Sequence, residues 1–274
     1  MSPQVQQTVF GEPIEETVRI ETTGRVIRPF KRMLDPWGRK DYTEYKLWVD
    51  VDGIRVRYVN PSNTALVINR IEPEAFDSFD VDELTVLGVN SQSFGSALRH
   101  ARYGVSTDDE LTITADSSQL QTVTHREIAD QKATITEQFD LIDPDSIRES
   151  DEVNIDEDML TAEVDLSADA FIEVVRMLDD SSGTATKFKQ SNGVFEIQQE
   201  QDVERRNIQL EVGEGNAEAM FSSDMVARIS NALHMGFVDD VTMKWGDEFP
   251  VFVEFEREDV YSGEIMLAPR VTRE

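Results

Sequence analysis

The sequence predicts an α+β fold in which two similar halves each carry two helices on antiparallel sheets. Most of the 274 residues form short runs in which apolar and polar side chains alternate, as they do in half-buried strands. Only four stretches have apolar side chains at helical spacing. The second and fourth of these each lead through an acidic turn into a strand, which indicates an internal duplication.

The predicted strands are short, and Asp52-Gly53 and Asn192-Gly193 each lie between two of them. Such dipeptides favour the tight turn of a β-hairpin. The clearest strands are Thr17–Glu21, Lys46–Val51, Ile54–Val59, Ala65–Asn69, Leu111–Ala115, Ala133–Asp140, Thr186–Lys189, Val194–Gln198, Asn207–Val212, Val241–Trp245, Val251–Arg257 and Gly263–Ala268.

Two predicted helices fall in each half of the chain. They are Gly24–Leu34, Ser91–Tyr103, Ser167–Asp179 and Ser222–Met235. Ser91, Ser167 and either Ser222 or Ser223 suit the N-cap position, where a hydroxyl accepts a backbone N–H. Pro29 is tolerated only in a first turn, which favours a start of the first helix near Arg28.

The duplication is clearest in the second and fourth helices. Phe94, Leu98, Ala101 and the turn Asp108-Asp109 match Met225, Ile229, Ala232 and Asp239-Asp240 at a constant offset of 131 residues. A chance match of a common helix–turn–strand unit is the alternative. The paired hairpins favour duplication.

A connector joins the two halves. Pro144 and the acidic run from Glu149 to Asp158 mark it, and its apolar side chains Phe139, Leu141, Ile142 and Ile147 indicate a docking surface. The predicted division is a flexible N-terminal extension at 1–14, a first domain at 15–140, the connector at 141–157 and a second domain at 158–274.

The acidic composition indicates a protein from a cytoplasm with a high salt concentration. The chain holds 55 acidic and 26 basic residues, a net charge of −29, and the acids are scattered along its whole length. High salt screens the repulsion within such a surface. The alternative is an acidic protein that binds a basic partner. No basic-then-apolar leader and no apolar run of about 18 residues is found, so we expect a cytoplasmic protein without a membrane span.

Catalytic constellations are missing from the sequence. There are no cysteines, no glycine-rich phosphate loop and no HExxH motif, and the three histidines lack ligand spacing. The acidic groups Asp50-x-Asp52 and Asp156-Glu157-Asp158 are expected by chance in so acidic a chain. The sequence therefore predicts a binding protein that is not an enzyme and has no cofactor, metal site or catalytic residue.

One segment is basic against this background. Seven bases lie between Arg19 and Lys40, and within the first helix Arg25, Arg28, Lys31 and Arg32 share one face, while Val26 and Ile27 face the core. The second helix adds Arg99, His100 and Arg102. Two cationic helices in an acidic chain indicate a surface that faces phosphate without reading bases. Local ion pairing with carboxylates is the alternative.

Five motifs in register resemble the archaeal and eukaryotic sliding clamps, the proliferating-cell-nuclear-antigen family. They are DGIRVRYVNPSNTALV (Asp52 to Val67), LIDPDSIR (Leu141 to Arg148), MFSSDMV (Met220 to Val226), GDEFPVFVEFE (Gly246 to Glu256) and MLAPRV (Met266 to Val271). The departures are residues 1–14, an insertion from Asp35 to Tyr45, and Asn60 in place of the usual Asp. They suit a virus-borne or paralogous clamp of a halophilic archaeon.

The resemblance implies a duplicated DNA-clamp fold that forms a ring-shaped homotrimer, with helices lining a hole for double-stranded DNA. The DNA-binding residues that it implies, together with the basic helix faces, are Arg25, Arg28, Lys31, Arg32, Arg99, Arg102, Arg176 and Arg228. Acids on the third helix, and Asn231 where many family members carry lysine, leave the lining lopsided. Contacts with DNA should therefore concentrate on the first domain.

The resemblance also implies partners: DNA polymerase, other proteins with a short docking motif, and a clamp loader. The docking groove would comprise Val59, Asn63, Leu66, Leu141, Ile142, Ile147, Pro250, Met266, Ala268, Pro269 and Val271. For Leu66 and Ile142 especially, ordinary core packing remains the alternative.

Subunits in this family join through edge strands, here Ala133–Asp140 and Glu204–Val212, with Arg205 and Arg206 facing Glu137 and Asp140. The alternative functions are a clamp homologue that does not close a ring and serves as a scaffold or decoy, and a virion or surface β-protein.

Overall fold

The computed structural model describes residues 17–23, 26–27, 31, 44–60, 62–101, 109–147, 156–179, 185–200, 205–236 and 238–270. The predicted extension at 1–14 and most of the insertion from Asp35 to Tyr45 lie outside these residues.

The first half consists of short strands with one described helix longer than a turn. Its elements are β1 (Val18–Thr23), β2 (Glu44–Asp50), β3 (Gly53–Val59), β4 (Ala65–Ile71), the 3-10 turn η1 (Pro73–Ala75), β5 (Ser78–Val81), β6 (Thr85–Asn90), α2 (Ser91–Ala97), β7 (Glu110–Ala115), β8 (Gln119–Ile128) and β9 (Gln131–Asp140). Of the first predicted helix, Val26, Ile27 and Lys31 are described, and all three are helical.

The second half repeats this pattern after two 3-10 turns. Its elements are η2 (Pro144–Ser146), η3 (Glu157–Met159), β10 (Ala162–Ser167), α3 (Ala168–Asp179), β11 (Ala185–Ser191), β12 (Val194–Glu200), β13 (Arg205–Glu211), β14 (Ala217–Ser222), α4 (Ser223–Gly236), β15 (Asp240–Trp245), β16 (Val251–Arg257) and β17 (Tyr261–Leu267).

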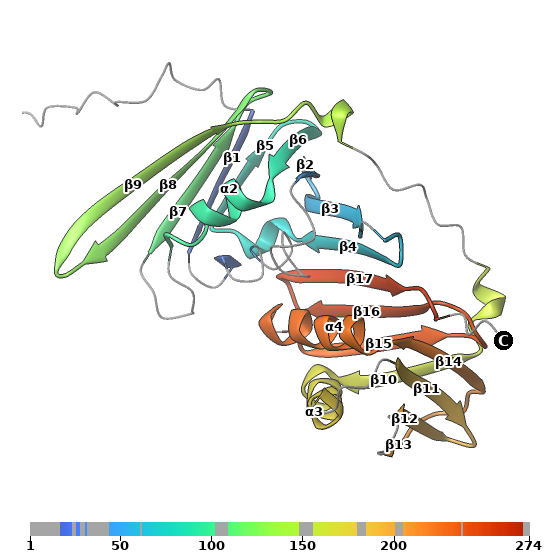
Figure 1. Ribbon diagram of the computed structural model, residues 1–274. Coiled ribbons are helices and arrows are strands. Elements are labelled where there is room, and N and C mark those ends of the chain that lie inside the picture. Colours follow the sequence, from blue (N-terminus) through green and yellow to red (C-terminus); the bar gives the residue numbers. More distant parts are fainter. Residues whose placement is uncertain are drawn as a thin grey trace, which may run out of the picture.

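Three antiparallel sheets organise the described strands (Figure 1). A central sheet of eight strands runs in the order β10-β15-β16-β17-β4-β3-β2-β6, and its β17–β4 pair joins the two halves of the chain. A sheet of five strands, β5-β1-β7-β8-β9, belongs to the first half. A sheet of four strands, β13-β12-β11-β14, belongs to the second.

The duplication predicted from sequence is confirmed by strand order. In the first half β1 is followed across its sheet by β7, β8 and β9, and β6 by β2, β3 and β4. In the second half β10 is followed by β15, β16 and β17, and β14 by β11, β12 and β13. Asn90 and Ser222 end equivalent strands, so the pairing aligns the following helices one residue beyond the offset read from sequence.

The core lies between the helices and the sheets. Helices α3 and α4 pack against each other, and α3 also contacts β10 and β15 of the central sheet (Figure 1). In the second half four aromatic rings form the series Phe221–Phe188–Trp245–Phe195, in which successive ring centroids lie 5.1 to 6.2 Å apart. Val26 and Ile27 are fully buried, as the helical spacing predicts. Such close packing of apolar side chains is the main source of stability in a fold of this kind.

Both predicted hairpins are present. The β11–β12 turn has Asn192 at φ 53° and Gly193 at φ 76°, which are the two left-handed residues of a type I′ turn. At the β2–β3 turn Gly53 has φ 120°, and a Cβ there would lie 2.2 Å from the carbonyl oxygen of Ile71. This close approach requires glycine.

The prediction of Ser91 as an N-cap is wrong. Asn90 caps α2, because its side-chain oxygen accepts the backbone N–H groups of Gln92 and Ser93. The predicted helix to Tyr103 is also too long. After Ala97 the backbone N–H groups of Arg99 and His100 bond three residues back, to Ser96 and Ala97, which tightens the chain into a turn.

The N-cap of α3 agrees with prediction, since Ser167 Oγ accepts the N–H of Ala170 at 3.3 Å.

Candidate functional site

Three groups of residues correspond to the sites predicted from sequence: the cations on the helices, the apolar row on the central sheet, and the two outer sheet edges. Among the described residues no cluster of three or more His, Asp or Glu is placed to hold a metal ion. Likewise, no described helix is long and apolar enough to cross a membrane.

The predicted cations that the structure describes belong to all four predicted helices and have different surroundings. Arg99, at the end of α2, is exposed and donates to Ser96 Oγ at 2.8 Å, and Arg176 is exposed on α3. Arg228 on α4 forms an ion pair with Asp224 at 2.9 Å, one helical turn away. Lys31 is half-buried. Arg25, Arg28, Arg32 and Arg102 lie outside the described residues.

The helices of the second half present acids beside these bases. Asp169 and Glu173 are exposed on α3 near Arg176, and Asn231 is exposed on α4. The Arg228–Asp224 pair is solvent-exposed and adds little to stability, but it neutralises the arginine locally. The α3–α4 surface is therefore less favourable to phosphate than a surface of bases alone.

An apolar row crosses the central sheet on the face turned away from the helices. Strand pairing places Val59 opposite Leu66, Leu66 opposite Met266, and Met266 opposite Phe252. Leu66 and Phe252 are 3% and 5% exposed, yet neither belongs to the main core cluster. These four side chains, which we call the apolar row, form a second, smaller apolar surface.

Phe252 was not among the predicted groove residues. Its strand, Val251–Arg257, begins with three consecutive apolar residues, so both faces of the sheet are apolar there. That lack of alternation was the available signal, because a strand covered on one face alone alternates.

The loop between β3 and β4 is held by Asn60. Its side-chain oxygen accepts the backbone N–H groups of Thr64 and Ala65 at 2.7 and 3.0 Å, so the amide performs the acceptor role open to an aspartate. The N–H of Ala268 in turn donates to the carbonyl of Thr64 at 2.8 Å. Exposed Asn63 and half-buried Pro250, Ala268 and Pro269 lie just beyond the ends of these strands. Val271 lies outside the described residues.

The predicted connector residues lie elsewhere, along β6 at the edge of the central sheet. The N–H of Ile142 donates to the carbonyl of Gly88 at 2.8 Å, and Ile147 is 9% exposed. A Cβ on Gly88 would lie 2.1 Å from the carbonyl oxygen of Ile142, so only glycine admits this approach. Since β2 separates β6 from β3, the predicted groove residues form two groups, one on each side of β2.

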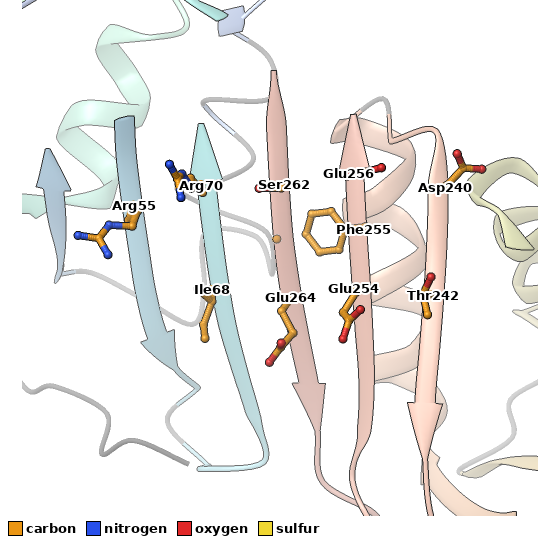
Figure 2. Close-up of a pocket in the computed structure, with 11 residues that line it drawn as sticks. Arg55, Ile68, Arg70, Asp240, Thr242, Glu254, Phe255, Glu256, Ser262 and Glu264 are labelled. Atoms are coloured by element: carbon orange, nitrogen blue, oxygen red, sulfur yellow. The ribbon is translucent and has the colours of Figure 1, made fainter. Parts of the chain in front are cut away.

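Figure 2 shows the residues that line a cavity of about 610 Å³ on the central sheet. Its residues Ile68, Glu254 and Glu264 lie two positions along their strands from Leu66, Phe252 and Met266, so the cavity is next to the apolar row on the same face. The two sides of the cavity carry opposite charges. Arg55 and Arg70 lie on β3 and β4, whereas Glu254, Glu256 and Glu264 lie on β16 and β17. Arg55 pairs with Asp50 at 2.8 Å and Lys244 with Glu254 at 2.9 Å.

Glu264 is the least favourably placed of these carboxylates, because it lies directly opposite Glu254 in the β16–β17 pair. Burial raises the pKa of Glu264, the Glu254 carboxylate raises it further, and Lys244 and Arg57 partly offset both effects. A group whose pKa is raised by folding contributes stability below its ordinary value, and the contribution is lost as pH rises through the folded-state pKa.

We therefore expect Glu264→Gln to raise the melting temperature at pH 7 by about 2 °C. The gain should shrink as pH falls through the raised pKa of folded Glu264 and should vanish below the ordinary pKa of glutamate, where the side chain is protonated in both the folded and the unfolded chain. Thermal unfolding followed by circular dichroism from pH 4 to 8 measures this. Glu256→Gln, at an exposed position on the same face, should change the melting temperature little.

The two strands predicted to join subunits are both outer strands of their sheets. Strand β9 pairs with β8 alone and β13 with β12 alone among the described strands. Glu137 on β9 contacts His100 Nδ1 at 2.6 Å, and Asp140 accepts from Gln119 at 3.3 Å. Arg206 on β13 donates to the Met177 carbonyl at 2.8 Å. The side chain of Arg205 lies outside the described set.

The chain is similar in sequence to known proteins. Residues 28–148 match the family model of the proliferating cell nuclear antigen N-terminal domain. The DNA polymerase sliding clamp of Haloarcula marismortui is 26% identical over 254 residues, covering 84% of this chain and 91% of that protein. That of Archaeoglobus fulgidus is 28% identical over 233 residues, covering 81% and 87%.

Solved structures agree on the fold. The A. fulgidus PCNA bound to the C-terminal region of FEN-1 matches with a TM-score of 0.78 and 24% identity, over 94% of this chain and 100% of that chain. The PCNA of Entamoeba histolytica matches with a TM-score of 0.75 and 17% identity, over 93% and 100%.

Proposed function

Because this chain belongs to the DNA polymerase sliding clamp family, we propose that it is a sliding clamp, which encircles duplex DNA and tethers DNA polymerase and other replication and repair proteins to it. The clamp family consists of processivity factors without enzymatic activity. The observation that carries the proposal is the duplicated strand order, which leaves β9 and β13 as outer edges through which copies can join.

The assembly that we propose is a homotrimer closed head to tail, because β9 and β13 are different surfaces of one chain. Each copy would contribute a first domain at 15–140, a connector at 141–157 and a second domain at 158–274. The β17–β4 pair inside the copy would then be one of the joints around the ring. A homologue that serves as a scaffold without closing a ring is not favoured by the family comparison.

A closed ring retains DNA by topology, so weak contacts with phosphate are sufficient and allow sliding. We propose that Arg25, Arg28, Lys31, Arg32, Arg99 and Arg102 provide most of these contacts. Arg176 and Arg228 would contribute less, because Asp169, Glu173 and Asp224 share their helices. Retention by encirclement suits the salt-loaded cytoplasm of a halophilic archaeon, which the net charge of −29 and the haloarchaeal relatives support.

Partner proteins would dock on the apolar row. A short motif with apolar and aromatic anchors can cover Val59, Met266 and the neighbouring Leu66 and Phe252. Asn63, Pro250, Ala268 and Pro269 would lie at the ends of this row, and the connector residues at the far side of β2. Apolar floors with a few backbone acceptors are typical of such anchor sites. A clamp loader and a DNA polymerase are the partners that the proposal requires.

The decisive experiment compares circular with linear DNA. Clamps loaded onto nicked circular DNA by a haloarchaeal clamp loader should remain bound in about 2 M salt, in which simple phosphate contacts are lost. Cutting the circle once should release them within minutes, because a ring slides off the ends. Equal retention on circular and linear DNA would refute encirclement, and a solution mass of one 31.1 kDa chain would refute the ring.

A further inference from the structure

We propose that β9 of one copy pairs with β13 of a second copy in a single register, which sets Glu137 opposite Arg206 of the partner subunit. This inference rests on the proposed ring and specifies how neighbouring copies align. It follows from the internal duplication, because the chain already contains one joint of the same kind.

That internal joint is the antiparallel pair of β17 and β4. Its register sets Tyr261 opposite Ile71, Ile265 opposite Val67 and Leu267 opposite Ala65. All of these side chains are buried in the core on the helix side of the sheet. In the order of the two halves, β9 holds the position of β17, and β13 holds the position of β4.

Two alignments fix which residues are equivalent. The two-residue turns at 51–52 and 192–193 superpose the β2–β3 hairpin on the β11–β12 hairpin, and the β3–β4 and β12–β13 pairings then match Val67 with Arg206. Strand β7 superposes on β15 over its full length, and the pairings through β8 and β16 match Ile265 with Glu137. Because Ile265 is opposite Val67 in the internal joint, the equivalent residues Glu137 and Arg206 should be opposite each other between copies.

The resulting pairs are complementary. On the helix side Glu137 meets the partner's Arg206, Ile135 meets the partner's Ile208, and Ala133 meets the partner's Leu210. On the opposite face Lys132 meets the partner's Glu211. Both ion pairs thus join opposite charges, and the half-buried isoleucines cover each other. At the internal joint Val260 and Glu72 hold the positions of Lys132 and Glu211. These two residues are paired, because the N–H of Glu72 donates to the carbonyl of Val260.

Shifts of two residues, the smallest that keep the same faces inward, lose this complementarity. In one direction Glu137 would meet Ile208, and Phe139 would meet Arg206. In the other direction Ile135 would meet Arg206, and Lys132 would meet Gln209. Each shift sets a charge against an apolar side chain, and each breaks both ion pairs, which is unfavourable across strands.

The side chains of Glu137 and Arg206 already lie on the face of the sheet that this arrangement requires. Glu137 contacts His100, and Arg206 reaches the carbonyl of Met177 at the end of α3, so both lie on the helix side of their strands. Because Glu137 and Arg206 take the places of Ile265 and Val67, the joint between copies is more polar than the joint within a copy. Salt should therefore weaken the former more than the latter.

Hydrogen bonding shows which pairs suit a cross-link. At the internal joint the N–H of Glu72 donates to Val260 and the N–H of Ala268 donates to Thr64. Because hydrogen-bonded and non-hydrogen-bonded pairs alternate along antiparallel strands, the odd-numbered residues of β17, such as Ile265 opposite Val67, are not hydrogen-bonded to their partners. Such pairs have Cα atoms about 4.5 Å apart, within the range of a disulfide. Ile135 and Ile208 hold equivalent positions between copies.

The natural chain has no cysteines, so the double variant Ile135→Cys with Ile208→Cys carries only the test pair. Under mild oxidation we expect covalent dimers and trimers on a non-reducing gel. The shifted control, Ile135→Cys with Leu210→Cys, should cross-link about fivefold less, because its sulfur atoms are too far apart. Circular dichroism checks that both variants fold.

A charge reversal provides the second readout. Glu137→Arg alone should weaken assembly about tenfold, and Glu137→Arg with Arg206→Glu should restore most of the loss, as measured by dilution in light scattering.

Equal cross-linking of the matched and shifted pairs, or no recovery in the reversed pair while the natural chain still forms trimers, would overturn the register and leave the ring intact. A natural chain that stays monomeric would overturn the ring itself.

Discussion

Thr136→Pro is expected to convert the proposed trimer into monomers without unfolding the subunit. The N–H of Leu141 donates to the carbonyl of Ser118, which continues the β8–β9 ladder. The backbone N–H and C=O groups of successive residues point to opposite edges of a strand, so the odd-numbered residues of β9, like Leu141, bond to β8. The N–H of Thr136 therefore points to the outer edge, where proline removes a bond to the second copy and none within the subunit.

Size-exclusion chromatography with light scattering should give a mass near 31.1 kDa for this variant at micromolar concentration, with a near-normal circular dichroism spectrum. Retention on circular DNA should fall to background, because an open subunit cannot encircle the duplex. Thr136→Val keeps the N–H and the shape of the side chain, so it should remain trimeric. A trimer of Thr136→Pro with normal DNA retention would rule out β9 as the joint.

Local sequence predicted local features well. The Asn192-Gly193 turn, the burial of Val26 and Ile27 and the cap by Ser167 each depend on a few neighbouring residues, and all are present. The cap of α2 was misplaced by one residue because Asn90 and Ser91 are equally good capping residues. The early end of that helix depends on a change from α to 3-10 bonding, which no single residue specifies.

Features that depend on distant pairing were harder to predict. The resemblance to known clamps named Leu66 and Met266 as groove residues, and the β4–β17 pairing sets them opposite each other. Phe252 joins them through β16, and its burial outside the main core follows only from knowing which strands are neighbours. Similarly, nothing in the sequence around Ile142 shows that β2 separates it from that row.

Met266→Asp is expected to abolish binding of docking-motif peptides while leaving the ring intact. Met266 is half-buried at the centre of the apolar row, between Leu66 and Phe252, so a carboxylate there would be desolvated by any apolar anchor laid across it. An uncompensated charge under an anchor costs about 3 kcal/mol, which is roughly a hundredfold in affinity. Isothermal titration calorimetry with a docking-motif peptide at high salt measures the loss.

Met159→Asp is the matched control, because Met159 is 48% exposed on the 3-10 turn η3 and lies outside the row. It should bind the peptide as the natural chain does. Both variants should remain trimeric, since neither residue lies on β9 or β13. If Met266→Asp bound the peptide normally, the partner surface would have to lie on the connector side of β2, where Ile142 pairs with Gly88 and the other predicted groove residues, Leu141 and Ile147, follow along the connector.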